Sequence, residues 1–220
     1  VLLGVMAVDG LVRIRRHGFS PWGVFCRDVG LVYASIGGVW LLAERAGWSP
    51  MGFGSDIVLL TAVHFHFAGL ILPVIASLVL ARRPTCPGAH IASVLILIGV
   101  PLVAVGILVT HRGGPVWVEF TVVWILALGG LGVAVQHLVL AVIEKKVCPL
   151  VRGLWTIAGL SLALGMVLAG LYSSRVYFAP MPWLDIPWMR MLHGSINALG
   201  FSLPALLAWC RSGRNCCTGN

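Results

Sequence analysis

Long runs of apolar residues make up most of the chain, and short polar breaks separate them. An α-helix needs roughly 20 apolar residues to cross the hydrocarbon core of a bilayer. The breaks carry turn-forming and basic residues, as in Trp48-Ser49-Pro50 and Arg82-Arg83-Pro84. The runs cover residues 1–12, 29–45, 55–81, 89–111, 115–143, 151–172 and 188–210. We therefore predict an all-α fold, an integral membrane bundle of about seven transmembrane helices.

The first run is too short to cross a bilayer, because Arg13 follows it closely. We interpret it as the end of a helix whose start is missing or processed. A cleaved signal peptide is not expected, since no small-residue cleavage pattern precedes Arg13. No internal repeat and no linker is evident in the sequence, so we predict a single transmembrane domain over residues 1–220.

The composition excludes a soluble domain. Of the 220 residues, 59% are hydrophobic and 10% are charged, with a mean hydropathy of +0.99. A soluble domain carries about 25% charged residues, because its surface faces water. The net charge of +8 does not indicate nucleic-acid binding, since no basic helix or aromatic-basic module accompanies it. Lysine and arginine instead collect beside anionic lipid, so the expected partner is the lipid bilayer.

The basic residues predict an orientation. Eleven follow the first, third, fifth and seventh helices: Arg13, Arg15, Arg16, Arg27, Arg82, Arg83, Lys145, Lys146, Arg152, Arg211 and Arg214. The other side has four: Arg45, Arg112, Arg175 and Arg190. Cytoplasmic loops are enriched in these residues. We therefore predict a multi-pass protein of the cell membrane with its N-terminus outside and its C-terminus in the cytoplasm.

All six cysteines fall on the predicted cytoplasmic side: Cys26, Cys86, Cys148, Cys210, Cys216 and Cys217. Free thiols suit a reducing compartment. The adjacent pair Cys216-Cys217 is either an acylation site or a plain tail, and two adjacent cysteines do not make a metal site.

Most of the polar residues that break the apolar pattern fall toward the outer ends of the helices. Four acids lie there: Glu44, Asp56, Glu119 and Asp185. His64 and His66 lie roughly 12–15 Å along the third helix, and His193 and Asn197 lie one to two turns into the last. Ionisable groups at membrane depth usually face a cavity or a partner. We predict a polar pocket in the outer half of the bundle, between the second, third, fifth and seventh helices. Asp28 and Glu144 instead lie on the inner side among basic neighbours, and Asp9 is ambiguous.

Helical spacing refines the pocket. At about 100° per residue, Tyr33, Gly37, Trp40 and Glu44 share one face of the second helix. Arg190, His193, Asn197 and Phe201 likewise share one face of the last. His64 and His66 are about 200° apart on a straight helix, so one is expected to face the pocket and the other to bond a neighbouring helix.

These positions give two sets of candidate site residues. The polar, candidate catalytic set is Glu44, Asp56, Glu119, Asp185, His64, His193 and Asn197. The candidate substrate-binding set is Trp40, Trp124, Phe65, Tyr33 and Phe201. The simpler alternatives are that the histidines bond between helices and that the acids are solvated at the headgroups. No His-x-x-x-His, Glu-x-x-His or cysteine-rich ligand set occurs, so no metal and no cofactor are expected, although a lone histidine could still bind haem iron.

Two polar segments carry a family resemblance. Residues 61–69 read Thr-Ala-Val-His-Phe-His-Phe-Ala-Gly, and residues 193–201 read His-Gly-Ser-Ile-Asn-Ala-Leu-Gly-Phe. Together they resemble the YndJ-like membrane proteins, in which a His-Phe-His-aromatic-Ala-Gly helix and a His-Gly-x-x-Asn-x-x-Gly-Phe helix recur. The resemblance implies a multi-pass membrane protein of a family loosely described as transporters, without a settled substrate.

The architecture is also similar to that of small seven-helix membrane-bound terpene cyclases, which use one early carboxylic acid and one near the last helix. Glu44 and Asp185 occupy roughly such places. Acid-initiated cyclisation needs a neutral carboxylic acid, aromatic faces for carbocations and walls that exclude water. We predict an enzyme of this kind acting on a hydrophobic isoprenoid-type substrate, with His64, His193 and Asn197 orienting the acid. The alternatives are a secondary transporter, against which the lack of a visible repeat counts, a haem- or metal-dependent redox protein, and a structural subunit.

The predicted orientation is testable with a membrane-impermeant thiol reagent applied to intact cells. Because all six cysteines fall on the predicted cytoplasmic side, the native protein should stay unlabelled. Strong labelling of Cys86 or Cys148 would show that the orientation is reversed.

Overall fold

The computed structural model describes residues 1–178 and 183–213 of the chain. Part of the break predicted between the runs 151–172 and 188–210, together with Arg214, Cys216 and Cys217, lies outside these residues. The chain divides into two compact units, Val1–Ala81 and Arg82–Asn220, and each is considered separately. All regular elements of the described residues are helical, which confirms the predicted all-α class.

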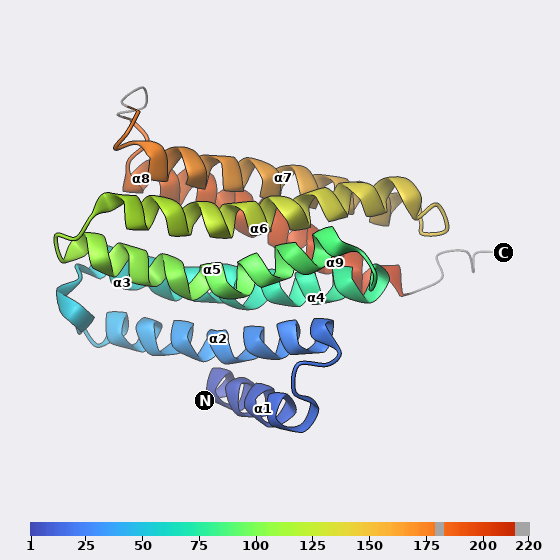
Figure 1. The fold of residues 1–220 in the computed structure, drawn as a ribbon, viewed down its shortest axis with the longest axis horizontal. Helices are drawn as coiled ribbons and strands as arrows, with labels where there is room; N and C mark the ends of the chain where they lie inside the picture. The colour runs from blue at the N-terminus through green and yellow to red at the C-terminus, as the bar shows by residue number, and fades with distance from the viewer. Residues whose placement is uncertain (179–182, 214–220) are drawn as a thin grey trace. The chain divides into compact units, whose positions relative to one another are not determined.

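Unit 1 contains two helices and one long helical rod. Helix α1 covers Leu2–His17 and α2 covers Trp22–Arg45, and a short turn of 3-10 helix, η1, covers Pro50–Gly52. The rod is continuous but changes its winding twice: α3 is Ser55–His64, η2 is Phe65–Ile71 and α4 is Leu72–Arg82. Helix α1 packs on α2, and α2 packs on α3 and η2 (Figure 1).

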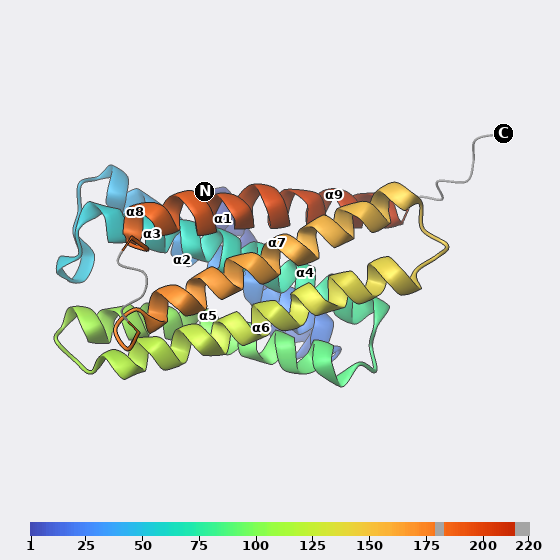
Figure 2. The same cartoon turned by 90° about the horizontal axis from the view of Figure 1, so that it is seen from above.

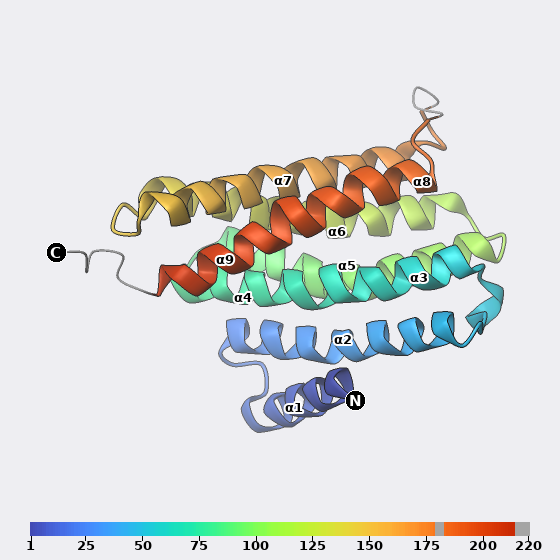
Figure 3. The same cartoon turned by 180° about the vertical axis from the view of Figure 1, so that it is seen from behind.

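Unit 2 contains three long helices and a second rod. The long helices are α5 (Pro87–His111), α6 (Val116–Ile143) and α7 (Pro149–Ser174). The rod consists of α8 (Ile186–Met189), η3 (Arg190–Gly194), η4 (Ile196–Ser202) and α9 (Leu203–Ser212). Figure 2 shows α5, α6 and α7 following one another as antiparallel neighbours, and Figure 3 shows α9 lying along α7.

Within residues 1–178 and 183–213, six helices are long and apolar enough to cross a membrane, which confirms a multi-pass bundle. They are Trp22–Arg45, Ser55–Arg82, Pro87–His111, Val116–Ile143, Pro149–Ser174 and Ile186–Ser212. Helix α1, with 16 residues, is shorter than these. The second apolar run, predicted to start at residue 29, instead belongs to a helix that starts at Trp22.

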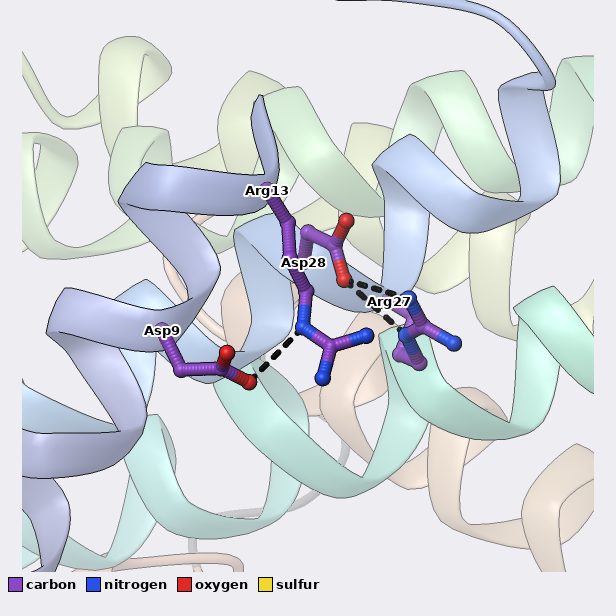
Figure 4. Close-up of polar contacts among 4 residues, drawn as sticks. All are labelled: Asp9, Arg13, Arg27 and Asp28. Carbon is purple, nitrogen blue, oxygen red and sulfur yellow. Dashed lines mark hydrogen bonds and ion pairs between the residues drawn. The ribbon is translucent and has the colours of Figure 1, made fainter. Parts of the chain in front are cut away.

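An ion pair explains why α2 starts earlier than its apolar run. Asp28 is only 1% exposed, and its Oδ1 accepts hydrogen bonds of 2.9 Å and 2.8 Å from the guanidinium of Arg27. Because the two charges compensate one another, the helix can include them. Figure 4 shows this pair close to a second one, Asp9 with Arg13 at 2.8 Å on α1. Asp28 therefore has the basic neighbour predicted for it, and Glu144 likewise lies 3.9 Å from Arg82.

Proline and glycine set the helix ends. Pro87 and Pro149 occupy the first turns of α5 and α7, and Pro21 and Pro115 directly precede α2 and α6. Proline suits these positions because the first N–H groups of a helix have no partner within it. Gly113 follows the end of α5 with a φ of 78°, a left-handed conformation that glycine adopts without strain.

Small residues allow α5 and α6 to approach closely. A Cβ added to Gly99 would lie 2.8 Å from the Cα of Leu126, and one added to Gly129 would lie 3.0 Å from the backbone nitrogen of Ile96. Helices in a membrane associate through such close contacts, because lipid supplies no hydrophobic drive between them. The α5–α6 contact therefore depends on the absence of a side chain at Gly99 and at Gly129.

This dependence predicts that Gly99→Ala destabilises unit 2. The added methyl group meets backbone, which cannot move aside, so overpacking should cost about 1–3 kcal/mol. Thermal unfolding in detergent measures the change. The control is Gly153→Ala on α7, where nothing lies within 4 Å of the added Cβ. Equal melting temperatures for the two variants would contradict the close approach of α5 and α6.

Candidate functional site

Both polar motifs of the sequence lie where a membrane-spanning rod leaves the α-helical form. The His-Phe-His motif extends from the end of α3 into η2, and the His-Gly-x-x-Asn motif extends from the end of η3 into η4; these three η segments are π-helical. A π-helix bonds residue i to residue i+5, is rare, and often marks a functional site. These segments are the candidate functional elements, one rod in each unit.

Proline explains why both rods widen. Pro73 and Pro204 directly follow the first α-helical residues after η2 and η4, and proline has no N–H to donate to the carbonyl four residues earlier. The preceding leucines bond in the wider register. Leu72 N–H donates to the carbonyl of Phe67, and Leu203 N–H donates to the carbonyl of Ala198.

The widened turns correct the geometry predicted for the two histidines. The estimate that they are 200° apart assumed a straight α-helix. His64 is the last residue of α3, whereas His66 lies on η2, where residues no longer advance by 100° each. The same assumption is wrong for the face predicted to contain Arg190, His193, Asn197 and Phe201.

In unit 1, His66 of η2 lies against Gly37 of α2. Its Nδ1–H donates to the carbonyl of Ala62 at 2.7 Å, so in the neutral imidazole the lone pair is on Nε2. A Cβ added to Gly37 would lie 2.7 Å from that Nδ1. Tyr33 and Phe65 meet edge to face at 6.0 Å beside it. The face of α2 predicted from Tyr33 and Gly37 therefore does contact the polar motif.

The other predicted residues of unit 1 lie apart from this contact. His64 is half-buried and meets the ring of Phe65 edge-on at 5.5 Å. Trp40 packs on Phe53, with 6.1 Å between ring centroids. Glu44 lies 3.2 Å from the guanidinium of the adjacent Arg45, and Asp56 is exposed in the first turn of α3.

His193 and Asn197 form a connected pair in unit 2. The Nδ1–H of His193 donates to the carbonyl of Gly165 on α7 at 2.8 Å. The Asn197 amide donates to the carbonyl of His193 at 2.9 Å and lies 3.2 Å from its ring nitrogens. The Oδ1 of Asn197 is buried without a hydrogen-bond donor. Buried polar atoms are rarely left unpaired, so this acceptor is the exceptional feature of the pair.

Glu119 lies beside a cation and a group of aromatic rings. Its carboxylate is 3.7 Å from Nη1 of Arg175, whose guanidinium lies 3.7 Å from the ring centroid of Tyr172. Phe120 contacts Trp124 at 6.3 Å and Tyr177 at 5.2 Å. The Nε1 of Trp124 is buried without a hydrogen-bond acceptor. Glu119 therefore lies beside the cation that stacks on Tyr172, and its sequence neighbour Phe120 belongs to the ring cluster.

Asp185 and Phe201 have structural surroundings of their own. Asp185 is exposed and accepts from the backbone N–H of Trp188 at 3.1 Å, which caps α8. Phe201 is 3% exposed and meets His137 edge-on at 6.1 Å. The predicted pocket draws on residues of both units, so it stays a prediction, and each unit contributes its own polar rod.

His137, which is not among the predicted site residues, is the most buried histidine of the described residues at 0% exposure. Its Nδ1–H donates to the carbonyl of Val133 at 3.0 Å, and its Nε2 accepts from the indole N–H of Trp209 at 3.2 Å. Both ring nitrogens are thus satisfied in a neutral imidazole. The pair Gln136-His137 inside a long apolar run was the available signal.

Among the described residues, no group of three or more His, Cys, Asp or Glu side chains lies close enough to hold a metal ion.

The sequence model of the YndJ-like protein family matches residues 1–201, which include both polar rods up to Phe201. The chain belongs to the YndJ-like family. It is also 30% identical over 182 residues to the uncharacterized membrane protein YndJ of Bacillus subtilis (strain 168), covering 82% of this chain and 31% of that protein. The chain thus spans about a third of the length of that relative. No solved structure was found to match the chain. The family resemblance predicted from the two motifs is confirmed.

In this YndJ-like chain, the hydrogen bond between His137 and Trp209 predicts a coupling in a double-mutant cycle. Trp209→Phe removes the indole donor and leaves His137 Nε2 unpaired, whereas in a His137→Leu background the same change removes no bond. We expect an interaction energy of about 0.5–1.5 kcal/mol from unfolding in detergent. Trp155→Phe is the control, since the Nε1 of Trp155 has no partner, and its cost should be equal in both backgrounds. Additivity of His137→Leu and Trp209→Phe within roughly 0.3 kcal/mol would contradict the bond.

Proposed function

We propose that this YndJ-like chain works in membrane transport, and that the transported solute is small and donates hydrogen bonds. The observation that carries the proposal is the π-helical form of both polar rods within long apolar spans. Transporters often bind their substrates at interrupted membrane helices in corresponding parts of the chain. Polar side chains at membrane depth are costly and usually functional.

The hydrogen-bond acceptors of the two rods indicate the class of solute. The buried Oδ1 of Asn197 has no donor, and the Nε2 of His66 carries a lone pair because Nδ1 donates to Ala62. Both are hydrogen-bond acceptors. A hydroxyl- or ammonium-bearing solute satisfies acceptors, whereas an anion does not.

Acid-initiated cyclisation is the second candidate, and the aromatic group beside Glu119 favours it. Phe120, Trp124 and Tyr177 supply rings that would stabilise a carbocation. Against it, the carboxylate of Glu119 is paired with Arg175 and Asp185 caps a helix. Glu44 lies 3.2 Å from the guanidinium of Arg45, although its buried Oε2 makes no hydrogen bond. Cyclisation requires a neutral acid, and an acid engaged in an ion pair does not meet that requirement.

Transport is tested with purified protein in liposomes and three labelled probes: glycerol, ethanolamine and phosphate. Uptake of glycerol or ethanolamine should exceed that of protein-free liposomes, and phosphate uptake should not. Asn197→Leu should lower uptake about tenfold or more, since an acceptor lost from a desolvated site costs about 1–3 kcal/mol. Ser35→Ala is the control, because that hydroxyl donates to the carbonyl of Val32 in its own helix.

The same preparation tests cyclisation with geranylgeranyl diphosphate as the probe. The transport proposal predicts no cyclic product by mass spectrometry. A cyclic product that disappears in a folded Glu119→Gln variant would overturn transport in favour of the enzyme.

A further inference from the structure

We infer that the chain contains the same three-helix unit twice, and that His66 in the first copy is the counterpart of Asn197 in the second, each presented to the transported solute. The first copy is α1, α2 and the rod α3–η2–α4. The second is α6, α7 and the rod α8–η3–η4–α9, and α5 lies between the copies in the sequence. The inference about His66 rests on the proposed function.

The two rods correspond residue by residue. A constant shift in residue number that pairs Phe65 with Ile196 also pairs Ile71 with Ser202. The π-helical segments η2 and η4 therefore coincide from end to end. The same shift carries Leu72-Pro73 onto Leu203-Pro204. The wide-register bond from the leucine N–H, to Phe67 in one rod and to Ala198 in the other, coincides as well.

The helices that precede the rods match by a second shift. It carries Pro21, just before α2, onto Pro149 at the start of α7, and it carries Gly37 onto Gly165. The two shifts differ because the connection between helix and rod is longer in the second copy.

Two glycine contacts between helix and rod agree with both shifts, whereas the ends of the rods pack differently: α2 packs on α3 and η2, and α7 packs on η4 and α9. His66 lies on Gly37, 2.7 Å from the position of an added Cβ, and Asn197 lies on Gly165, at 2.6 Å. The next contact matches too. In the first copy Gly69 of the rod meets Tyr33, at 3.2 Å from its added Cβ. In the second copy Gly200 meets Ser161, at 2.6 Å, and these are the residues that the two shifts pair.

The first helices of the two copies cross their neighbours at a matching place. Gly10 of α1 meets Leu31 of α2, with 3.1 Å from its added Cβ, and Gly159 of α7 meets Leu138 of α6 at 2.9 Å. The second shift carries Leu31 onto Gly159. A glycine therefore stands at the same crossing in each copy, once on the first helix and once on the second.

The paired polar residues make the same bond to their own rod. The side chain of His66 donates to the carbonyl of Ala62, and that of Asn197 donates to the carbonyl of His193, each four residues earlier. Each side chain keeps an acceptor, Nε2 in the first copy and Oδ1 in the second. His64 corresponds instead to Ser195, which is exposed. His66, rather than His64, is therefore the residue that unit 1 presents to the solute.

Accessibility of introduced cysteines tests this pairing without knowledge of the substrate. The six native cysteines are replaced by serine, and His66→Cys and Asn197→Cys are made separately in that background. Liposomes are treated with a permanently charged methanethiosulfonate, which reacts through water and not through lipid. The controls are Val63→Cys and Leu199→Cys, at exposed apolar positions of the same rods. Both test positions should react at least about tenfold faster than the controls, since a thiol in apolar surroundings stays protonated.

The outcomes separate the inference from the proposed function. Reaction at position 197 alone, or at position 66 alone, overturns the pairing and leaves transport standing. Reaction at neither position, beyond the rate of the controls, overturns transport and the pairing together. Folding is checked by gel filtration in detergent. Should a variant at 66 or 197 aggregate, Tyr33→Cys and Ser161→Cys carry the same comparison, because the two shifts pair these residues and they contact the glycines of the rods.

Discussion

The missing backbone N–H of Pro73 and of Pro204 is the constraint on which the polar parts of the structure depend. Within a bilayer no water can satisfy a carbonyl that loses its donor, so the helix must adjust internally. In both rods the leucine before the proline bonds five residues back, and the helix widens. The widened turns hold His66 and Asn197 against their neighbouring helices.

Glycine on the neighbouring helix makes that position possible. Gly37 and Gly165 leave the space that the imidazole and the amide occupy, with less than 3 Å to the position of a Cβ. Helix packing and polar chemistry are thus coupled at the same residues. This differs from the contact of α5 with α6, where glycines bring two backbones together and no polar side chain takes part.

The charged side chains named above lie at helix ends or are paired with an opposite charge. Asp28 is paired with Arg27, Glu119 with Arg175, and Glu144 with Arg82. In a low-dielectric environment the negative charge of a carboxylate needs a nearby positive charge. The groups left with unused acceptors in the rods are uncharged, which is why hydrogen bonding, and not proton donation by an acid, carries the proposed function.

The sequence by itself determined the class of fold, the family, and five of the six long spans to within a few residues; the remaining span starts at Trp22 rather than at residue 29. Hydropathy and bilayer thickness act on each segment alone, so a run of apolar residues is enough to predict a helix. The sequence also predicted that Tyr33 and Gly37 share one face of α2 with Trp40 and Glu44, because residues of a regular helix advance by a constant angle. Of these four, the structure brings Tyr33 and Gly37 to the polar rod.

Only the tertiary structure decided the rest. The change of hydrogen-bond register at Phe65 and Ile196 alters the direction of every later side chain, and a fixed period cannot anticipate it. The partner of His137 is Trp209, whose indole N–H donates to it from 72 residues away in the sequence. The sequence alone does not reveal the inferred repeat, because few residues are identical between the copies, among them Gly37 with Gly165 and Pro73 with Pro204. What the copies share is a set of contacts between helices, and contacts of that kind exist only once the chain has folded.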